Sequence, residues 1–187
     1  MKTFFPFAIL SFILLSSCGR TLSPFTARVY DEGRFTEAEL KRIQFYLSEP
    51  IVLTRELRAE KAEVISGEIK LVNGQQVEQV VIPKGTPGAV LFTPDRERLA
   101  ISFESGSDDR YLIFGPNPTM NDRYTLRASD WDRRAAIVTY NGRKWRAGGS
   151  AALATLLVDL RKVDQVSVRS RTAGGRRVDE WRLLKSF

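Results

Sequence analysis

The stretch AAIVTYNGRKWRA, residues 135–147, decides the fold class of this chain. It holds two short segments of alternating apolar and polar residues, separated by Asn141-Gly142. An Asn-Gly pair between such segments is the strongest short-range signal for a β-hairpin. A two-residue loop sets Val138 opposite Trp145, so that apolar side chains meet on one face. The sequence therefore predicts an antiparallel hairpin with this register.

A second Asn-Gly pair, Asn73-Gly74, predicts another hairpin earlier in the chain. There a two-residue loop would set Leu71 opposite Gln76, an apolar residue against a polar one. A three-residue loop sets Leu71 opposite Val77 instead, which matches apolar with apolar. We therefore expect a bulged turn at this position.

Other segments from residue 51 onward show the same two-residue alternation, for example around Leu99, Ile101 and Phe103. Residues 111–114 are apolar on both faces, which is typical of a central strand. The strands follow one another in hairpins rather than alternating with helices, which argues against a parallel α/β fold. We expect a mainly β fold of roughly nine or ten strands, an antiparallel twisted sheet closed into a barrel or folded as a sandwich.

Two short helices are predicted as caps of this sheet. In the first, Thr36 and Glu39 have the spacing of a capping box, and Pro50 prevents continuation, so the helix should run from Thr36 to Ser48. The second should begin with Ser150 as N-cap and bury the leucines at positions 153, 156, 157 and 160.

The C-terminal region is predicted as a basic hairpin, with a strand at Val166–Val168, a turn at Gly174-Gly175 and a returning strand at Val178–Leu184. The segment 161–187 holds eight basic and three acidic residues, whereas the rest of the chain is nearly neutral. Exposed like charges repel one another, so a purely structural hairpin gains little from clustering them. We therefore expect an anionic partner to bind its four clustered arginines, Arg169, Arg171, Arg176 and Arg177.

The composition excludes several classes of site. The chain has no histidine and one cysteine, which removes Ser-His-Asp and Cys-His catalysis, His-ligated metals and sites built on several thiolates. Phosphate-binding and dinucleotide-binding glycine motifs are absent from the sequence, as is the nucleophile-elbow motif. No metal and no cofactor are therefore predicted.

The N-terminus has the order of features found in an export signal. Lys2 is followed by the uncharged segment Phe4–Leu15, which is too short to span a membrane but suits the central region of a signal peptide. Leu15-Ser16-Ser17-Cys18 then resembles the lipobox of bacterial lipoproteins. The resemblance implies that Cys18 is lipidated and becomes the first mature residue. Gly19, where enterobacterial lipoproteins retained in the inner membrane carry Asp, indicates the outer membrane.

The predicted layout has a signal peptide at residues 1–17, a lipidated N-terminus and tether at 18–33 and a single mainly β domain at 34–187. A lipid anchor places the domain at a membrane in the cell envelope. Its expected partners are a protein complex of the envelope or an anionic envelope component, and not nucleic acid. The function predicted on this basis is that of a non-enzymatic binding protein or accessory subunit.

The alternative is a carboxylate-dependent hydrolase acting on cell-wall glycan or peptide. Such an enzyme needs two carboxylates on opposite sides of a cleft. The acidic pairs of the sequence, such as Asp108-Asp109, instead lie next to each other in segments predicted as turns. This arrangement favours the binding protein over the hydrolase.

Overall fold

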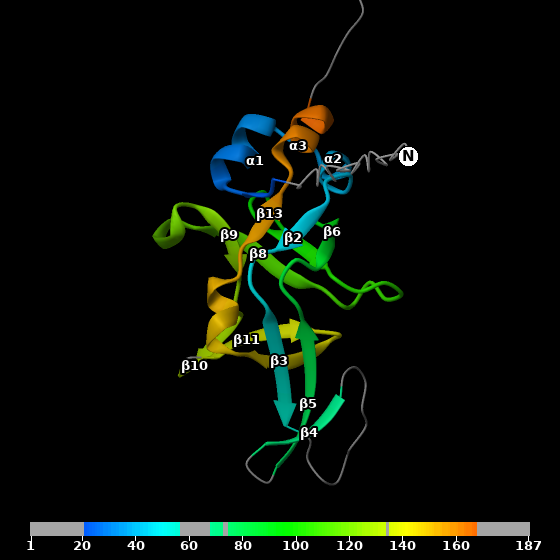
Figure 1. Cartoon of the computed structure of the whole chain (residues 1–187), viewed down its shortest axis with the longest axis vertical. Helices are drawn as coiled ribbons and strands as arrows, with labels where there is room; N and C mark the ends of the chain where they lie inside the picture. Colours follow the sequence, from blue (N-terminus) through cyan, green and yellow to red (C-terminus); the bar gives the residue numbers. More distant parts are fainter. Residues whose placement is uncertain (1–20, 57–67, 73–74, 134, 168–187) are drawn as a thin grey trace, which may run out of the picture.

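The computed structural model describes residues 21–56, 68–72, 75–133 and 135–167 (Figure 1). The fold is mainly β, as predicted, with two antiparallel sheets and three helices. The described strands do not close into a barrel, and their arrangement is sandwich-like. Among the described helices, none is both long and apolar enough to cross a membrane.

The larger sheet has seven strands. Their order across the sheet is β1 (Ser23–Pro24), β13 (Leu156–Val158), β2 (Phe45–Leu47), β6 (Pro87–Phe92), β7 (Leu99–Ser102), β8 (Leu112–Asn117) and β9 (Arg123–Leu126). Both termini of the described chain contribute to this sheet, because β1 pairs with β13 and β13 pairs with β2. Segments far apart in the sequence thus close the fold.

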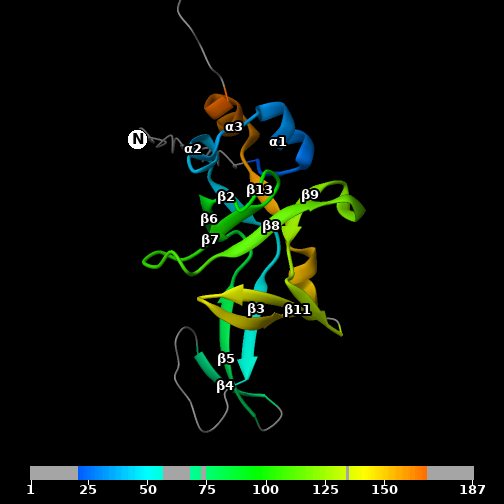
Figure 2. The same cartoon turned by 180° about the vertical axis from the view of Figure 1, so that it is seen from behind.

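The smaller sheet has six strands. Their order is β10 (Asp130–Asp132), β11 (Ala135–Tyr140), β12 (Arg143–Ala147), β3 (Ile51–Glu56), β5 (Gln75–Ile82) and β4 (Glu68–Val72). Val138 pairs with Trp145, which confirms the register predicted for the Asn141-Gly142 hairpin. The views in Figures 1 and 2 show β3 and β5 extending away from the larger sheet, so that the molecule is elongated.

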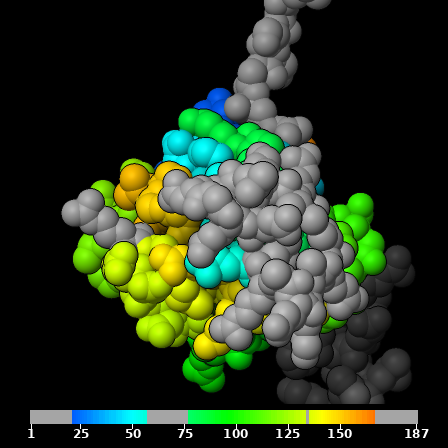
Figure 3. Space-filling view, turned by 90° about the horizontal axis from the view of Figure 1, so that it is seen from below, coloured from blue at the N-terminus to red at the C-terminus, as the bar shows by residue number. Residues whose placement is uncertain are grey.

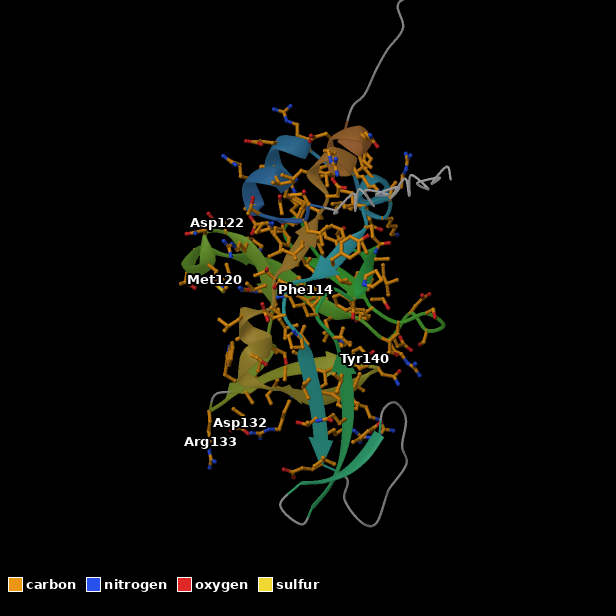
Figure 4. All side chains as sticks on the ribbon, in the orientation of Figure 1. Phe114, Met120, Asp122, Asp132, Arg133 and Tyr140 are labelled. Atoms are coloured by element: carbon orange, nitrogen blue, oxygen red, sulfur yellow. The ribbon has the colours of Figure 1, made fainter. Side chains whose placement is uncertain are left out.

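The core is formed by buried side chains from both sheets and from the helices, and it is rich in aromatic residues. Phe25 is fully buried and makes edge-to-face contacts with Phe45, at 5.1 Å between ring centroids, and with Tyr124, at 4.9 Å. Phe114 lies at the centre of the molecule (Figure 4). In the smaller sheet Trp145 is buried and donates its indole N–H to the carbonyl of Tyr140 at 2.9 Å.

The helices α1 (Ala27–Gly33), α2 (Glu37–Leu40) and α3 (Leu160–Ser167) gather at one end of the molecule (Figure 1). The capping box at α2 is confirmed. The Thr36 hydroxyl accepts a hydrogen bond from the backbone N–H of Glu39 at 3.3 Å, and the Glu39 carboxylate accepts one from the N–H of Thr36 at 2.8 Å. Short 3-10 helices occur at Pro118–Met120 and Gly149–Leu153.

The predicted length of the first helix is wrong, because α2 ends at Leu40 rather than Ser48. Residues Phe45–Leu47 form β2, whose backbone pairs with β13 and β6. The apolar residues at 40, 43 and 47 that suggested one helical face are all buried, but they reach the core from a helix, a turn and a strand. Pairing with distant strands overrides the local helical pattern here.

Two predictions near the C-terminus are also wrong. Ser150 does not cap an α-helix: Gly149–Leu153 is a 3-10 helix, and Leu156–Val158 is β13. Val166 lies in α3 and not in a strand. Over so few residues the apolar pattern fits helix and strand periods equally well. The pairing of β13 with β1 and β2 decides the first case, whereas Val166 belongs to the amphipathic helix Leu160–Ser167.

The expectation of a tether up to residue 33 is likewise wrong. Ser23–Pro24 pairs with β13, Phe25 is fully buried, and α1 follows directly with the Thr26 hydroxyl accepting from the N–H of Val29 at 3.3 Å. Residues 23–33 therefore belong to the packed domain, and Phe25 supplies one of the largest fully buried side chains of the core.

The strand register expected from a bulged turn at Asn73-Gly74 is wrong; the two turn residues themselves lie outside the described residues. Leu71 pairs with Gln76 and Ile69 pairs with Glu78, which is the register of a two-residue loop. The apolar-to-polar match that argued against this register is tolerated because Glu78 is fully buried and forms an ion pair with Arg55 on β3. A paired carboxylate can occupy a core-facing position that an unpaired one would avoid.

Candidate functional site

A surface groove runs across β8 and β9 of the larger sheet toward β11 of the smaller one, and we call it the arginine groove. Its charged end, a hollow of about 470 Å³, is lined by Asp95, Arg96, Glu97, Arg98, Pro116 and Arg127. Its apolar end, about 340 Å³, is lined mainly by Phe92, Pro94, Tyr111, Ile113, Ala128 and Val138. Arg98 and Arg127 line both hollows, so the two ends meet at these side chains.

Strand register sets this geometry. Leu99 pairs with Phe114 and Gly115 pairs with Thr125, which brings Arg98 and Arg127 to the two sides of Gly115. A Cβ atom at Gly115 would lie 3.2 Å from Cγ of Arg98 and 3.3 Å from Cδ of Arg127. Because glycine has no side chain, the aliphatic parts of both arginines approach the backbone of β8 at this point. Seen from below, the yellow-green and yellow segments around β10, β11 and β12 form much of the visible coloured surface (Figure 3).

The loop that carries Arg96 is held at its start by α2. The carboxylate of Glu37 accepts hydrogen bonds from the N–H of Thr93 at 3.3 Å and from its hydroxyl at 2.8 Å, and it forms an ion pair with Lys41 at 2.7 Å. The hydrogen bond from Lys41 and those from Thr93 lower the pKa of Glu37 to about 2. The carboxylate thus stays ionised, and the loop stays attached to α2, over the whole neutral range.

The same loop is closed on itself by Asp95. Its carboxylate accepts from the backbone N–H of Glu97 at 3.0 Å, from that of Arg98 at 2.9 Å, and from the Arg98 guanidinium. Partial desolvation raises the pKa of Asp95, but these hydrogen bonds and the Arg98 charge outweigh it and lower the pKa. Both carboxylate oxygens of Asp95, and the Nε–H of Arg98, are therefore already used in hydrogen bonds within the loop.

Arg96 and Arg127 are the groove's available cations. Both are exposed, and among the residues that the structure describes neither guanidinium has an ion-pair or hydrogen-bond partner. Arginine presents a planar fork of N–H donors that matches the oxygens of a carboxylate or phosphate. Arg96 and Arg127, which line the same hollow, can thus donate hydrogen bonds to a carboxylate or phosphate.

The apolar end is formed by two sheets together. Phe92 is 36% exposed and packs edge-to-face on Tyr111, with ring centroids 5.1 Å apart at 79°. Ile113 extends this surface along β8, and Val138 faces it from β11 of the smaller sheet. A concave, mostly apolar surface with a few polar groups is the usual form of a small-molecule site.

A second polar cluster is buried and serves the fold. Arg55 forms its ion pair with Glu78 and lies over the ring of Trp145, with 5.5 Å from its Cζ to the ring centroid. Tyr140, at the tip of the β11–β12 hairpin, is nearly fully buried, and burial together with the Glu104 carboxylate raises the pKa of its hydroxyl. Figure 4 places Tyr140 on the opposite side of the molecule from Asp132 and Arg133.

The residues predicted as site residues lie outside the described part of the chain. This holds for Cys18 and for the four arginines, Arg169, Arg171, Arg176 and Arg177. The strand expected to carry Arg169 and Arg171 is not present up to Ser167, where α3 ends. The lipid anchor and the basic C-terminus therefore stay predictions.

The arginine groove itself was missed by the sequence reasoning. Its cations come from two separate segments: Arg96 and Arg98 lie in the loop between β6 and β7, and Arg127 follows β9. The sequence held a weak signal for these positions. Arg98 directly precedes an apolar strand and Arg127 directly follows another, which places both residues at strand ends. Only the pairing of β7, β8 and β9 brings them together.

Comparison with known proteins gave no relative. No protein-family model matches the chain, and neither a curated protein nor a solved structure matches it.

Proposed function

We propose that this protein is a non-enzymatic binding module of the cell envelope, held at the outer membrane by a lipid on Cys18 and binding an anionic envelope component. The anchor rests on the sequence of the first 18 residues. One observation supports the binding activity above all: the arginine groove joins two cations that have no ion-pair or hydrogen-bond partner among the described residues to a concave apolar surface. Such a combination of apolar wall and few polar groups is typical of ligand sites.

Binding is favoured over hydrolysis at this site. The two carboxylates of the groove, Asp95 and Glu97, belong to one loop and do not face each other across the hollow. A general acid needs a raised pKa, whereas the pKa of Asp95 is lowered by its hydrogen bonds and by Arg98. The groove therefore has the chemistry to hold an anion, and Asp95 is not suited to donate a proton.

The proposal is tested on three matched proteins that lack the expected leader and Cys18 but keep every described element, residues 19–187. The first is the unmodified chain and the second carries Arg96→Gln and Arg127→Gln in the groove. The third carries Gln at the four C-terminal arginines, Arg169, Arg171, Arg176 and Arg177. Each is mixed with lipopolysaccharide, anionic vesicles or peptidoglycan, and the bound fraction is measured by sedimentation.

The unmodified chain should bind at least one of these components, and binding should weaken as salt rises, because exposed charge attraction is screened. The groove variant should lose most of this binding while keeping its melting temperature. A loss confined to the C-terminal variant would assign binding to the basic tail instead. If the unmodified chain binds none of the three components, the proposed function is wrong.

A further inference from the structure

We infer that the arginine groove binds an anionic single-chain amphiphile, with its acid group on Arg127 and its chain along Phe92, Tyr111 and Ile113. The inference deepens the proposed function, since it names the class of ligand that the binding site takes. It rests on the charges and surfaces of the described groove and not on the lipid anchor.

The charged end selects an acid group. Three arginines and two carboxylates line it, but Asp95 is engaged with Arg98 and with two backbone N–H groups of its own loop. Arg127 and Arg96 keep donors that no described residue accepts. With Glu97 counted as well, the lining still holds one more arginine than carboxylates. A carboxylate or phosphate would accept hydrogen bonds from these donors, whereas a cation would meet a net positive charge.

The apolar end selects a chain attached to that acid group. It begins where the charged end stops, at the shared side chains Arg98 and Arg127, so one molecule can occupy both hollows. Its volume of about 340 Å³ lies at the lower end of the range for small-molecule sites. A small inorganic anion would leave the apolar surface of Phe92 and Ile113 exposed to water, which removes its contribution to binding.

The shape of the groove favours a single chain over a bilayer surface. Phe92 and Ile113 come from β6 and β8 of the larger sheet, and Tyr111 directly precedes β8. Val138 and Thr139 come from β11 of the smaller sheet. The apolar surface is therefore a hollow between two sheets rather than a protruding patch that could insert into a membrane. A chain drawn from a lipid, or a free fatty acid, fits this concave form.

The test uses isothermal titration of residues 19–187 with octyl phosphate, kept below the concentration at which it forms micelles. Octanoate tests whether a carboxylate serves as well as a phosphate. Inorganic phosphate supplies the acid group alone, and octyl glucoside supplies the chain alone. The variants are Arg127→Gln and Phe92→Ala, with Arg123→Gln as a matched control, because Arg123 lies on the same strand, β9, outside the groove.

Octyl phosphate should bind saturably, and inorganic phosphate and octyl glucoside should each bind at least tenfold more weakly. Arg127→Gln should weaken octyl phosphate binding at least tenfold, Phe92→Ala should weaken it severalfold, and Arg123→Gln should leave it unchanged, with all melting temperatures similar. Equal binding of octyl glucoside would contradict the acid site, and equal binding of inorganic phosphate would contradict the apolar site. No binding of octyl phosphate, or no effect of Arg127→Gln, overturns the inference.

The two proposals fail separately. If octyl phosphate does not bind but an envelope component still does so through the groove arginines, the ligand class is wrong and the binding function stands. If octyl phosphate binds in the groove while no envelope component binds, the site is correct and the envelope function is wrong.

Discussion

Arg55 and Glu78 show how single residues hold the smaller sheet together. Glu78 is fully buried on the same face of β5 as Val80 and Ile82, and its carboxylate pairs with Arg55 from β3, whose side chain is 17% exposed. Arg55 in turn covers the ring of Trp145. One cationic side chain thus neutralises a buried charge and packs on the largest core side chain.

Replacing Arg55 by Met should therefore destabilise the protein strongly. The substitution keeps an aliphatic side chain but removes the charge that compensates the buried Glu78 carboxylate. Breaking a buried ion pair from one side typically costs about 3 kcal/mol. Urea unfolding of the wild type and Arg55→Met measures this difference, and the double variant Arg55→Met, Glu78→Leu should recover much of it. A loss of less than about 0.5 kcal/mol, the size typical of exposed pairs, would contradict the account.

Thr36 is the second residue-scale prediction. Its hydroxyl caps α2, so Thr36→Ala should lower the free energy of unfolding by roughly 0.5–2 kcal/mol. Thr36→Ser keeps the hydroxyl and should be nearly silent. Thermal or urea unfolding compares the two variants, and equal losses would mean that the cap is not the reason for the effect.

At the scale of elements, the stability that the contact between α2 and the loop after β6 contributes should depend on pH. The pKa of Glu37 is about 2 in the folded protein and near its ordinary value of 4.5 in the unfolded chain, chiefly because Lys41 and Thr93 donate hydrogen bonds to the carboxylate. A lowered folded pKa means that the contribution is complete above pH 4.5 and is lost as the pH falls toward 2.

Glu37→Gln should therefore remove part of the decline in stability between pH 4.5 and about 2 and change its slope little at neutral pH. The measurement is the melting temperature as a function of pH for both proteins, at constant ionic strength. Identical slopes in the acid range would show that Glu37 does not hold the loop.

The elements also show what could be predicted from the sequence. The Asn141-Gly142 hairpin was predicted with its register, because turn type and apolar pairing are both local and agree. The capping box at Thr36 was predicted for the same reason. Phe45–Leu47 was misassigned because three residues fit helix and strand equally well, and only the distant strands β13 and β6 decide.

The candidate site could not be predicted from the sequence for a related reason. Arg98 and Arg127 are 29 positions apart, and nothing local indicates that both lie beside Gly115. The pairing of β7 with β8 and of β8 with β9 creates their proximity. Apolar alternation predicts that such strands exist but not which of them become neighbours.

At the scale of the whole molecule, the arrangement separates a proposed anchor from a proposed binding site. The described chain starts at the end where α1, α2 and α3 gather, whereas the apolar end of the arginine groove reaches β11 of the smaller sheet. Cys18 precedes the first described residue in the sequence, and none of the groove residues lies near it in the sequence. In this proposal, a lipid on Cys18 therefore leaves the groove free to bind a ligand.

Cys18→Ser tests the anchor. Without the thiol no lipid can be attached, so the variant should remain an unprocessed precursor that incorporates no labelled palmitate. Wild type and variant are compared by metabolic labelling and by the mass of the purified protein. Acylation of the variant, with maturation at the same position, would refute the anchor.

The most direct test of the binding groove is a methyl NMR titration of residues 19–187 with octyl phosphate below its micelle concentration. Ile113 and Ala128 line the groove, whereas the methyl groups of Leu40 and Leu53 are buried elsewhere in the core. The account predicts saturable shifts at Ile113 and Ala128, none at Leu40 and Leu53, and loss of the shifts in Arg127→Gln. Shifts spread evenly over all four residues, or unchanged shifts in Arg127→Gln, would contradict it.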